Sequence, residues 1–512
     1  MRSVWSLLAV PASLALLLVP VQGYEVRRQS VDANADALVD KAKNIVNPLS
    51  PNQSGTPPDL TVVGDFSIPQ HAATPLLRSS AVLAKQLTFL YGPPVAGGPA
   101  YPTGVLGLLK VTADLASIQL DLTPEAAKAL LDVAGSVAGS GQYDGLQTLN
   151  DYTKLYQGEW VNTLPGGPDP GVLTNYTDDL FFSMERLSNS PYQVRRLDPS
   201  SDSLNFEIDD GIAKNLTGNT LEQLFSGGRL FYADYRDQAD LTPNVGKYSA
   251  ACDAYFYIHP TSGDFLPLAI RTNVGSNLIY TPADTANDWL LAKIMLNVND
   301  FWFAQWQHLA STHEVVQITY MAAIRTLSEQ HPVQGLLNRL MFQVFAIQPL
   351  AQTVLFDPLA AVDLDFAYSG SSASQYTTKL YKTGGAGRFQ ANYFESNLKS
   401  RGLIDASYGP ELKHFPFYED ASVVHDAIEA FMTDFVGSYY SSDSVVAADS
   451  ELQAWAKEAN GPADVIDFPS SITSKQALVD ILSHLVSWPQ LVIGCIADDE
   501  DRLILFRLRT TR

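Results

Sequence analysis

Cysteine is scarce in this sequence. Its 512 residues include only Cys252 and Cys495. Two cysteines form at most one disulfide, and they are too few for a disulfide scaffold or a cysteine-rich zinc site. A hydrophobic core must therefore provide the stability, and a hydrophobic content of 46% with 10% aromatic residues is ample for one.

Positive charge is also in deficit. The chain has 33 lysines and arginines against 55 aspartates and glutamates, which gives a formal net charge of −22 at pH 7. Such a surface repels nucleic acid and anionic membranes, so we expect no nucleic acid as a partner. The negative surface is compatible with an anionic lipid as a ligand, because binding such a lipid needs only one local basic residue or an apolar channel.

Long apolar runs of the kind that span a membrane are lacking after the N-terminus. The run from Val4 to Leu18 follows Arg2 and precedes the small residues of Val21-Gln22-Gly23. This is the pattern of a secretory signal, and the run is too short and too close to the start for a membrane anchor. We therefore predict a signal peptide at residues 1–23, a secreted extracellular protein and no transmembrane segment.

The rest of the chain divides by composition. Residues 24–82 are rich in Pro, Ser, Asn and Gln and are expected to form an extended, loosely held arm. Residues 83–487 form the main domain, and residues 488–512 form a tail of different character. Three sequons are candidate N-glycosylation sites in a secreted chain, at Asn52, Asn175 and Asn215.

Local patterns in the main domain predict a small sheet within a mainly helical fold. The stretches 255–258 and 266–272 favour strands. Thr123-Pro124-Glu125 is typical of a helix start, with proline at the first helical position. The apolar stretch 336–356 is expected to be helical, with a break or kink at Pro349.

Proline and glycine are absent between Pro282 and Pro332, where most residues are apolar or aromatic. The segment from Ala283 to His331 is therefore predicted to form one very long helix or two joined helices, apolar almost all round. Helices of this kind lie at the centre of large proteins. The fold class is accordingly mainly α, a large helical domain around a long central helix with a small β-sheet.

His308 and His313 lie five residues apart on this helix. In a regular α-helix that spacing separates the two side chains by about 140°, which is poor for binding one ion. One π-helical turn would bring them to the same face, and such turns concentrate at functional sites. From spacing alone, two unrelated histidines remain the alternative.

Ordered motifs around these histidines resemble the lipoxygenases, most closely the secreted fungal branch that includes the manganese lipoxygenases. The resemblance runs through 288–293, 299–300, the two histidines, 321–328 and 331–333. It extends to outlying motifs at 91–93, 101–104, 182–187, 265–270, 414–420 and 458–462. It covers about 83–486, and it implies a lipoxygenase-like catalytic domain at 83–487 without an N-terminal β-barrel domain.

The resemblance implies a function. His308 and His313 would bind one non-haem iron or manganese ion, and the chain would use O2 to convert polyunsaturated fatty acids of the linoleate type into hydroperoxides. Ala351 falls where the family carries the alanine or glycine that helps to decide the oxygenation position. Its neighbours are expected to line the same substrate channel, namely Leu350, Val354, Leu355 and Phe356. A monomer is expected.

Other histidines fit structural roles. We read His331 as a helix-end residue before Pro332, and His414 as part of a structural loop motif. His71 and His259 carry no motif, and His484 is not expected to act as a shifted ligand.

The resemblance fails near Ser487. Family members continue with a third histidine ligand, an asparagine four residues later and an apolar C-terminal residue whose carboxylate binds the metal. Here Pro489 is expected to interrupt the helix, and the ligand positions fall near Ile493 and Ala497, which cannot coordinate. No histidine follows His484 and no asparagine follows Asn460.

The tail itself offers no replacement ligands. Asp498-Asp499-Glu500-Asp501 is typical of a solvated charge run, and the chain ends in Arg-Leu-Arg-Thr-Thr-Arg. We therefore expect weak metal binding, uncovered apolar faces on the central helix and little or no activity.

Two alternatives to an active enzyme remain. One is a lipid-binding homologue that has lost the metal. The other is a faulty gene model through a retained intron, frameshift or mispredicted exon end. Translation of the genomic DNA beyond the Ser487 codon would reveal a His-x-x-x-Asn motif in the second case.

Overall fold

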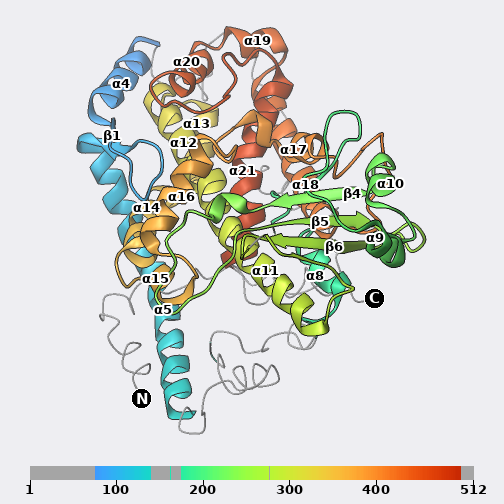
Figure 1. Ribbon diagram of the computed structural model, residues 1–512. Helices are drawn as coiled ribbons and strands as arrows, with labels where there is room; N and C mark the ends of the chain where they lie inside the picture. Colours follow the sequence, from blue (N-terminus) through green and yellow to red (C-terminus); the bar gives the residue numbers. More distant parts are fainter. Residues whose placement is uncertain (1–74, 140–161, 163–174, 189, 276, 498–512) are drawn as a thin grey trace.

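The structure, a computed structural model, describes residues 75–139, 162, 175–188, 190–275 and 277–497 (Figure 1). The expected signal peptide, most of the expected arm, Asn52, His71 and the run 498–501 lie outside these residues. Helices dominate, as the sequence predicts. They are α4 (Pro75–Thr88), α5 (Gly104–Gly139), α8 (Asp179–Glu185), α9 (Asp210–Thr217), α10 (Leu221–Ser226), α11 (Ala286–His308), α12 (Val315–Thr326), α13 (Pro332–Leu340), α14 (Ile347–Ala351), α15 (Ala361–Asp365), α16 (Gly370–Lys382), α17 (Phe394–Ser400), α18 (Pro416–Tyr439), α19 (Asp443–Ala448), α20 (Ser450–Asn460) and α21 (Lys475–Ala497).

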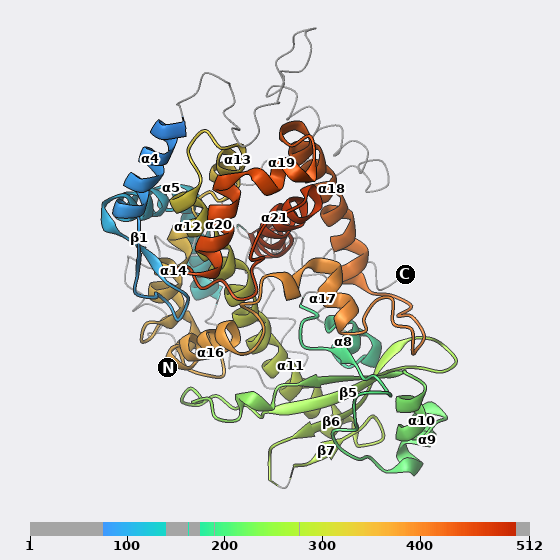
Figure 2. The ribbon, with the colours of Figure 1, turned by 90° about the horizontal axis from the view of Figure 1, so that it is seen from above.

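A five-stranded antiparallel sheet lies at one end of the helical body, with α9 and α10 beside it (Figure 2). Its strands follow one another in chain order, and the predicted stretches 255–258 and 266–272 lie in β5 and β6. The strands are β3 (Arg195–Arg196), β4 (Leu230–Asp234), β5 (Cys252–Ile258), β6 (Phe265–Thr272) and β7 (Ile279–Tyr280); β1 (Leu90–Gly92) and β2 (Tyr101–Thr103) form a separate pair.

Side chains alternate across this sheet because successive residues of a strand point to opposite faces. Phe231 and Phe256 belong to the main hydrophobic core, whereas Tyr232 and Tyr255 belong to a second cluster with Leu224 of α10. Cys252 is buried here as a free thiol. The sheet is therefore buried on both faces, and it extends the helical core instead of forming a separate domain.

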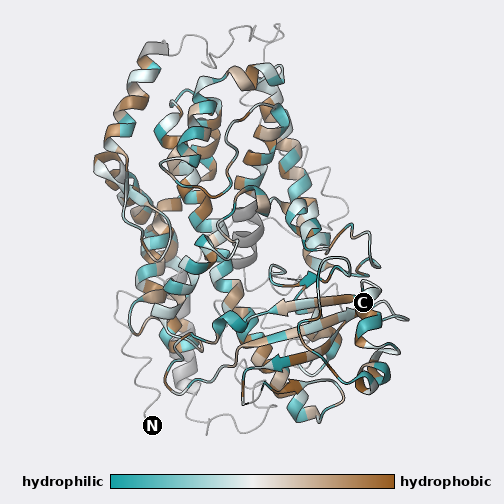
Figure 3. Cartoon of the chain, turned by 45° about the horizontal axis from the view of Figure 1, so that its top comes forward, coloured by the Kyte–Doolittle hydropathy of each residue, from teal (hydrophilic) through white to brown (hydrophobic). Residues whose placement is uncertain are grey.

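The central helix has the predicted position and length. It begins after the N-cap Thr285, whose side chain accepts from the backbone N–H of Asp288, and it continues through α11, a π-helical turn at Leu309–Glu314 and α12. It ends at Leu327, which is extended. Helices α16, α20, α21 and α4 pack around it, and Figure 3 shows apolar residues along these helices and along the strands.

Two predicted boundaries near the N-terminus of the described chain differ from the structure. Helix α5 runs through Thr123 and Pro124, so no helix starts there. The Thr123 hydroxyl donates to the carbonyl of Gln119 at 2.8 Å, as it does inside a continuous helix. Helix α4 crosses the boundary expected between residues 82 and 83.

Two other prolines do not break helices where the sequence predicts. Pro349 lies in the first turn of α14, where the proline N–H would be unpaired in any case, and the break comes earlier, at the left-handed Gln343. Helix α21 continues through Pro489 to Ala497. A proline removes one backbone hydrogen bond and bends a helix, and it need not end one whose neighbours on both sides are helical.

One described stretch, Val344–Asp365, is long and apolar enough by composition to cross a membrane. It is not a continuous helix, because a second π-helical turn at Gln352–Phe356 ends in the extended residue Asp357 before α15 begins. Phe345 and Val362 are fully buried in the core. A bilayer span needs an unbroken helix, so these features are those of a core segment.

Candidate metal centre

The π-turn at Leu309–Glu314 brings His308 and His313 together. Their Nε2 atoms lie 3.1 Å apart, and the two rings are nearly perpendicular, at 85°. Imidazole nitrogens bind divalent metals at about 2.1 Å, so two of them in adjacent octahedral positions lie about 3.0 Å apart. The wider turn that the sequence analysis requires is therefore present, and the geometry fits two ligands of one ion.

The orientation of His308 is set by its own helix. The Thr312 hydroxyl lies 3.2 Å from His308 Nδ1 and also donates to the His308 carbonyl. A polar contact at Nδ1 fixes the ring and leaves Nε2 facing His313. Trp306, two residues before His308, contacts Phe356 with ring centroids 5.2 Å apart.

Electrostatics keep both rings uncharged. Burial lowers the pKa of His313 to about 4. Burial also lowers the pKa of His308 well below its ordinary value, with a smaller contribution from His313. A metal binds the neutral imidazole and competes with protons for its nitrogen. These neutral nitrogen donors are therefore suited to hold a metal ion at neutral pH.

A buried polar cluster that the sequence analysis missed lies beside the π-turn. Neither carboxyl oxygen of Glu314 has a hydrogen-bond partner, and neither does the hydroxyl of Tyr381. Gln317 donates to Gln348 at 3.5 Å, which leaves Gln317 Oε1 and Gln348 Nε2 without partners. Burial raises the pKa of Glu314 well above its ordinary value, which favours the protonated carboxyl.

Close packing surrounds this cluster. A Cβ atom at Gly98 would lie 2.9 Å from Glu314 Oε1 and 2.5 Å from Gln348 Nε2, so the loop before β2 approaches only because residue 98 has no side chain. The sequence signal for the cluster was a glutamate within an apolar helix. The other members of the cluster include residues of α14 and α16, and periodicity along one helix cannot identify residues on other helices.

The predicted channel residues lie next to the metal-centre candidates. Ala351 ends α14, and Val354, Leu355 and Phe356 lie in the second π-turn. Helix α14 contacts the π-turn of the histidines. Ala351 and Phe356 are buried, and the other three are half-buried. Their role in a channel stays a prediction.

Four other histidines of the described chain have structural surroundings. His331 is the N-cap of α13, and its Nε2 lies 3.0 Å from Asp449. His259 accepts backbone N–H groups in a turn, and His414 is exposed. His484 is buried against Phe389, and burial lowers its pKa to about 3.

Helix α21 contacts the π-turn that carries His313. The positions where the resemblance expects a third histidine and an asparagine, 493 and 497, fall on the last turns of this helix. The helix from which further ligands are expected is thus packed beside the two histidines (Figure 1).

The expected glycosylation sites at Asn175 and Asn215 are accessible to different degrees. Asn175 is half-exposed before α8, and Asn215 is exposed in the last turn of α9. Their modification stays a prediction.

Comparison with known proteins gives one family. The lipoxygenase family model matches residues 183–490. A manganese lipoxygenase of Colletotrichum gloeosporioides is 45% identical over 92% of this chain and 76% of its own length, and one of Pyricularia oryzae is 41% identical over 96% and 77%. A solved manganese lipoxygenase structure matches with a TM-score of 0.78 at 43% identity, over 83% of this chain and 75% of that chain. The family match covers more than half of the chain together with the histidine pair, and the chain therefore belongs to the lipoxygenase family.

Proposed function

We propose that this chain is a lipoxygenase that converts polyunsaturated fatty acids of the linoleate type into hydroperoxides. We further propose that the 512-residue polypeptide holds its metal weakly and oxygenates its substrate poorly or not at all. The observation that carries the proposal is the 3.1 Å approach of His308 Nε2 to His313 Nε2 on a buried π-turn. The names of the relatives support manganese as the first metal to test, with iron as the other.

His308 and His313 would hold the ion through Nε2. A bound iron or manganese ion supplies one-electron redox chemistry, which is what removal of a hydrogen atom from a doubly allylic carbon and addition of O2 require. The chain's own contribution is to present two neutral donors and to exclude water. Trp302 and Trp306 are buried on the same helix as His308, and Trp306 packs on Phe356 of the second π-turn.

Substrate is proposed to lie along α14 and the second π-turn. Ala351 is buried and small, which leaves space at the helix face near the π-turn of the histidines. Leu350, Val354 and Leu355 would present apolar surface to a fatty-acid chain. Membership of a family that acts on lipids supports this assignment.

Weak activity follows from the ligand set. Two imidazoles satisfy fewer than half of six coordination positions, and a redox-active metal of this type needs oxygen ligands as well. The sequence has no histidine after His484 and no asparagine after Asn460. That same feature favours a second candidate function, a lipid-binding protein that keeps the apolar segment without catalysis. We also propose that the chain is secreted, which its N-terminal sequence supports.

Metal analysis with linoleate oxidation tests the proposal. The purified chain is loaded with Mn²⁺ or Fe²⁺, the metal per chain is measured, and conjugated-diene absorbance is followed. We expect less than one ion per chain at the π-turn, taken as the metal that the wild type holds beyond His308→Ala and His313→Ala, and no such loss in the control His259→Ala. Steady diene formation by the metal-loaded wild type would contradict weak activity, and equal metal content in the wild type and both alanine variants would contradict the site. Linoleate binding by the metal-free chain without oxidation supports the lipid-binding alternative.

A further inference from the structure

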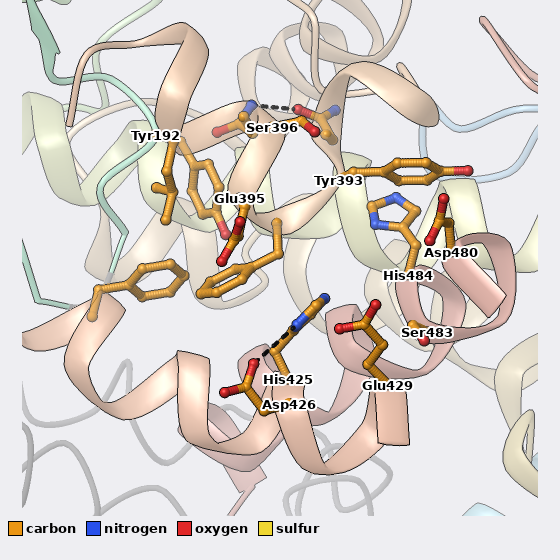
Figure 4. Close-up of a pocket in the computed structure, with 15 residues that line it drawn as sticks. Tyr192, Tyr393, Glu395, Ser396, His425, Asp426, Glu429, Asp480, Ser483 and His484 are labelled. Atoms are coloured by element: carbon orange, nitrogen blue, oxygen red, sulfur yellow. Dashed lines mark hydrogen bonds and ion pairs between the residues drawn. The ribbon is translucent and has the colours of Figure 1, made fainter. Parts of the chain in front are cut away.

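A cavity of about 260 Å³ lies between α17, α18 and α21, and neither His308 nor His313 lines it. Its walls combine aromatic rings with carboxylates, and no lysine or arginine is among the residues that line it. Figure 4 shows His425 and Asp426 of α18 on one wall, with Glu429 and with Ser483 of α21 beside them. The lipoxygenase reaction proposed above does not use this cavity.

Three potential metal ligands meet in the cavity. One ligand atom each from His425, Asp426 and Glu429 lies within 4.8 Å of the other two. His425 and Glu429 are four residues apart and so share one face of α18. Tetrahedral ligands at about 2.1 Å from one ion lie about 3.4 Å from one another. The three side chains, of which that of Asp426 is 77% exposed, must therefore turn inward to close around an ion.

Neighbouring residues orient two of the ligands. The ring of Phe394 stacks on His425 with centroids 4.9 Å apart and an interplanar angle of 25°. Gln476 Nε2 donates to Glu429 Oε1 at 3.3 Å and to Asp480 Oδ1 at 2.8 Å. Such contacts hold ligand side chains in place before an ion arrives and raise its affinity.

A second, independent observation also points to a polar ligand. Ser483 lines the cavity, is 2% exposed, and its hydroxyl has no hydrogen-bond partner among the described residues. Buried hydroxyl groups are nearly always paired, with protein or with ordered water. Rotation of the Ser483 side chain to another staggered rotamer would let the hydroxyl bond to a hydrated ion in the cavity. The negative charge of the cavity wall also favours a cation, because among the described residues no ion pair joins Asp426, Glu429 or Asp480 to a lysine or arginine.

We propose that His425, Asp426 and Glu429 form a second metal site that binds a divalent transition-metal cation such as Zn²⁺. One imidazole nitrogen with two carboxylate oxygens is a donor set that suits Zn²⁺, and water completes the coordination. All three ligands lie on α18, and Gln476 joins Glu429 to Asp480 of α21. The site therefore lies beside the contact between α18 and α21, the helix that packs against the π-turn.

Zn²⁺ titration tests the site. Bound equivalents are measured by equilibrium dialysis and metal analysis for the wild-type chain, for His425→Ala and for Glu429→Gln. His414→Ala serves as the control, since that histidine is exposed and 3.8 Å from only one carboxylate. Zn²⁺ held elsewhere, including by His308 and His313, is common to the wild type and the variants, so it cancels when their bound equivalents are subtracted. The outcome is therefore independent of the proposed lipoxygenase centre.

We expect the wild type and His414→Ala to bind one equivalent more than His425→Ala and Glu429→Gln. Gln476→Ala should weaken that equivalent about tenfold. Glu429→Gln keeps the shape of the side chain, and circular dichroism verifies that each variant is folded. Equal numbers of equivalents in the wild type, His425→Ala and Glu429→Gln would overturn the proposal.

Discussion

At the residue scale, His308 is half-buried and His331 is buried, and the two have different partners. His308 faces another imidazole, whereas His331 faces the carboxylate of Asp449 and caps a helix. The difference explains why identical residue types on one segment serve a metal centre in one case and folding in the other. The two histidines should therefore differ in the effect of replacement by alanine.

His308→Ala should abolish metal binding at the π-turn with little loss of stability, because its ring nitrogens bond only to neighbouring polar side chains. His331→Ala should leave metal content unchanged and reduce the free energy of unfolding by about 2–4 kcal/mol, because it leaves Asp449 buried without its main partner. Metal analysis and urea denaturation of both variants measure this contrast. The reverse pattern would contradict the assignment.

Asp449 gives a pH-dependent prediction. Burial opposes its ionisation, but hydrogen bonds and charge from His331, with a further bond from Tyr440, lower the pKa of Asp449 below its ordinary value. A carboxyl with a depressed folded-state pKa stabilises the fold above its unfolded pKa, and that stability is lost as pH falls through the folded pKa. Asp449→Asn should therefore destabilise the chain at pH 7 and progressively less below about pH 4. The exposed Asp240→Asn is the control, and a pH-independent difference for Asp449→Asn would contradict this reading.

At the element scale, the unbroken apolar run sufficed to predict the central helix, whereas the five-residue histidine spacing left two unrelated histidines as the alternative to a π-turn. The run is a local property, and a five-residue spacing on one face requires a wider turn. The family resemblance, and not the spacing alone, indicated that the two histidines share a face. Proline positions misled the prediction at Pro124, Pro349 and Pro489. The local cost of a proline, about 3 kcal/mol in a helix interior, is offset when tertiary packing holds both sides.

The polar cluster at Glu314 was beyond sequence reasoning for a different reason. Glu314 and Gln317 are close in sequence, but Gln348 and Tyr381 reach them from other helices. Only the packing of α14 and α16 against the π-turn brings the four together. Long-range proximity of this kind carries no periodic signal in one sequence.

Helix α21 provides a gain-of-function prediction. If it is the helix that lacks the third ligand, Ile493→His should increase Mn²⁺ affinity at least tenfold, since a third imidazole adds a coordinate bond. Val492→His is the matched control, because one residue along a helix turns the side chain by about 100°. Isothermal titration with Mn²⁺ measures both. Equal affinities for the two variants would contradict the placement of position 493.

At the scale of the whole molecule, part of the central helix faces outward. Leu291, Ile294 and Phe301 of α11 are 47%, 47% and 55% exposed. Their spacing places them on one stripe of the helix. Among the described residues this apolar stripe of α11 is partly exposed, and Phe301 stacks on Phe366.

Replacement of Leu291 and Ile294 by serine should reduce self-association of the purified chain, because exposed apolar stripes promote it. Light scattering after size-exclusion chromatography measures the fraction of monomer, which we expect to rise. Val245→Ser, at a fully exposed residue apart from this stripe, should leave the fraction unchanged. A rise in the fraction of monomer no larger than that for Val245→Ser would contradict the argument.

Pulsed electron paramagnetic resonance of the Mn²⁺-loaded chain tests most directly whether His308 and His313 share one ion. The account predicts nuclear couplings from two imidazole nitrogens in the wild type, and loss of both in His308→Ala and in His313→Ala, because neither variant holds the ion at the π-turn. Couplings unchanged in both variants, or present with no more than one nitrogen in the wild type, would contradict it.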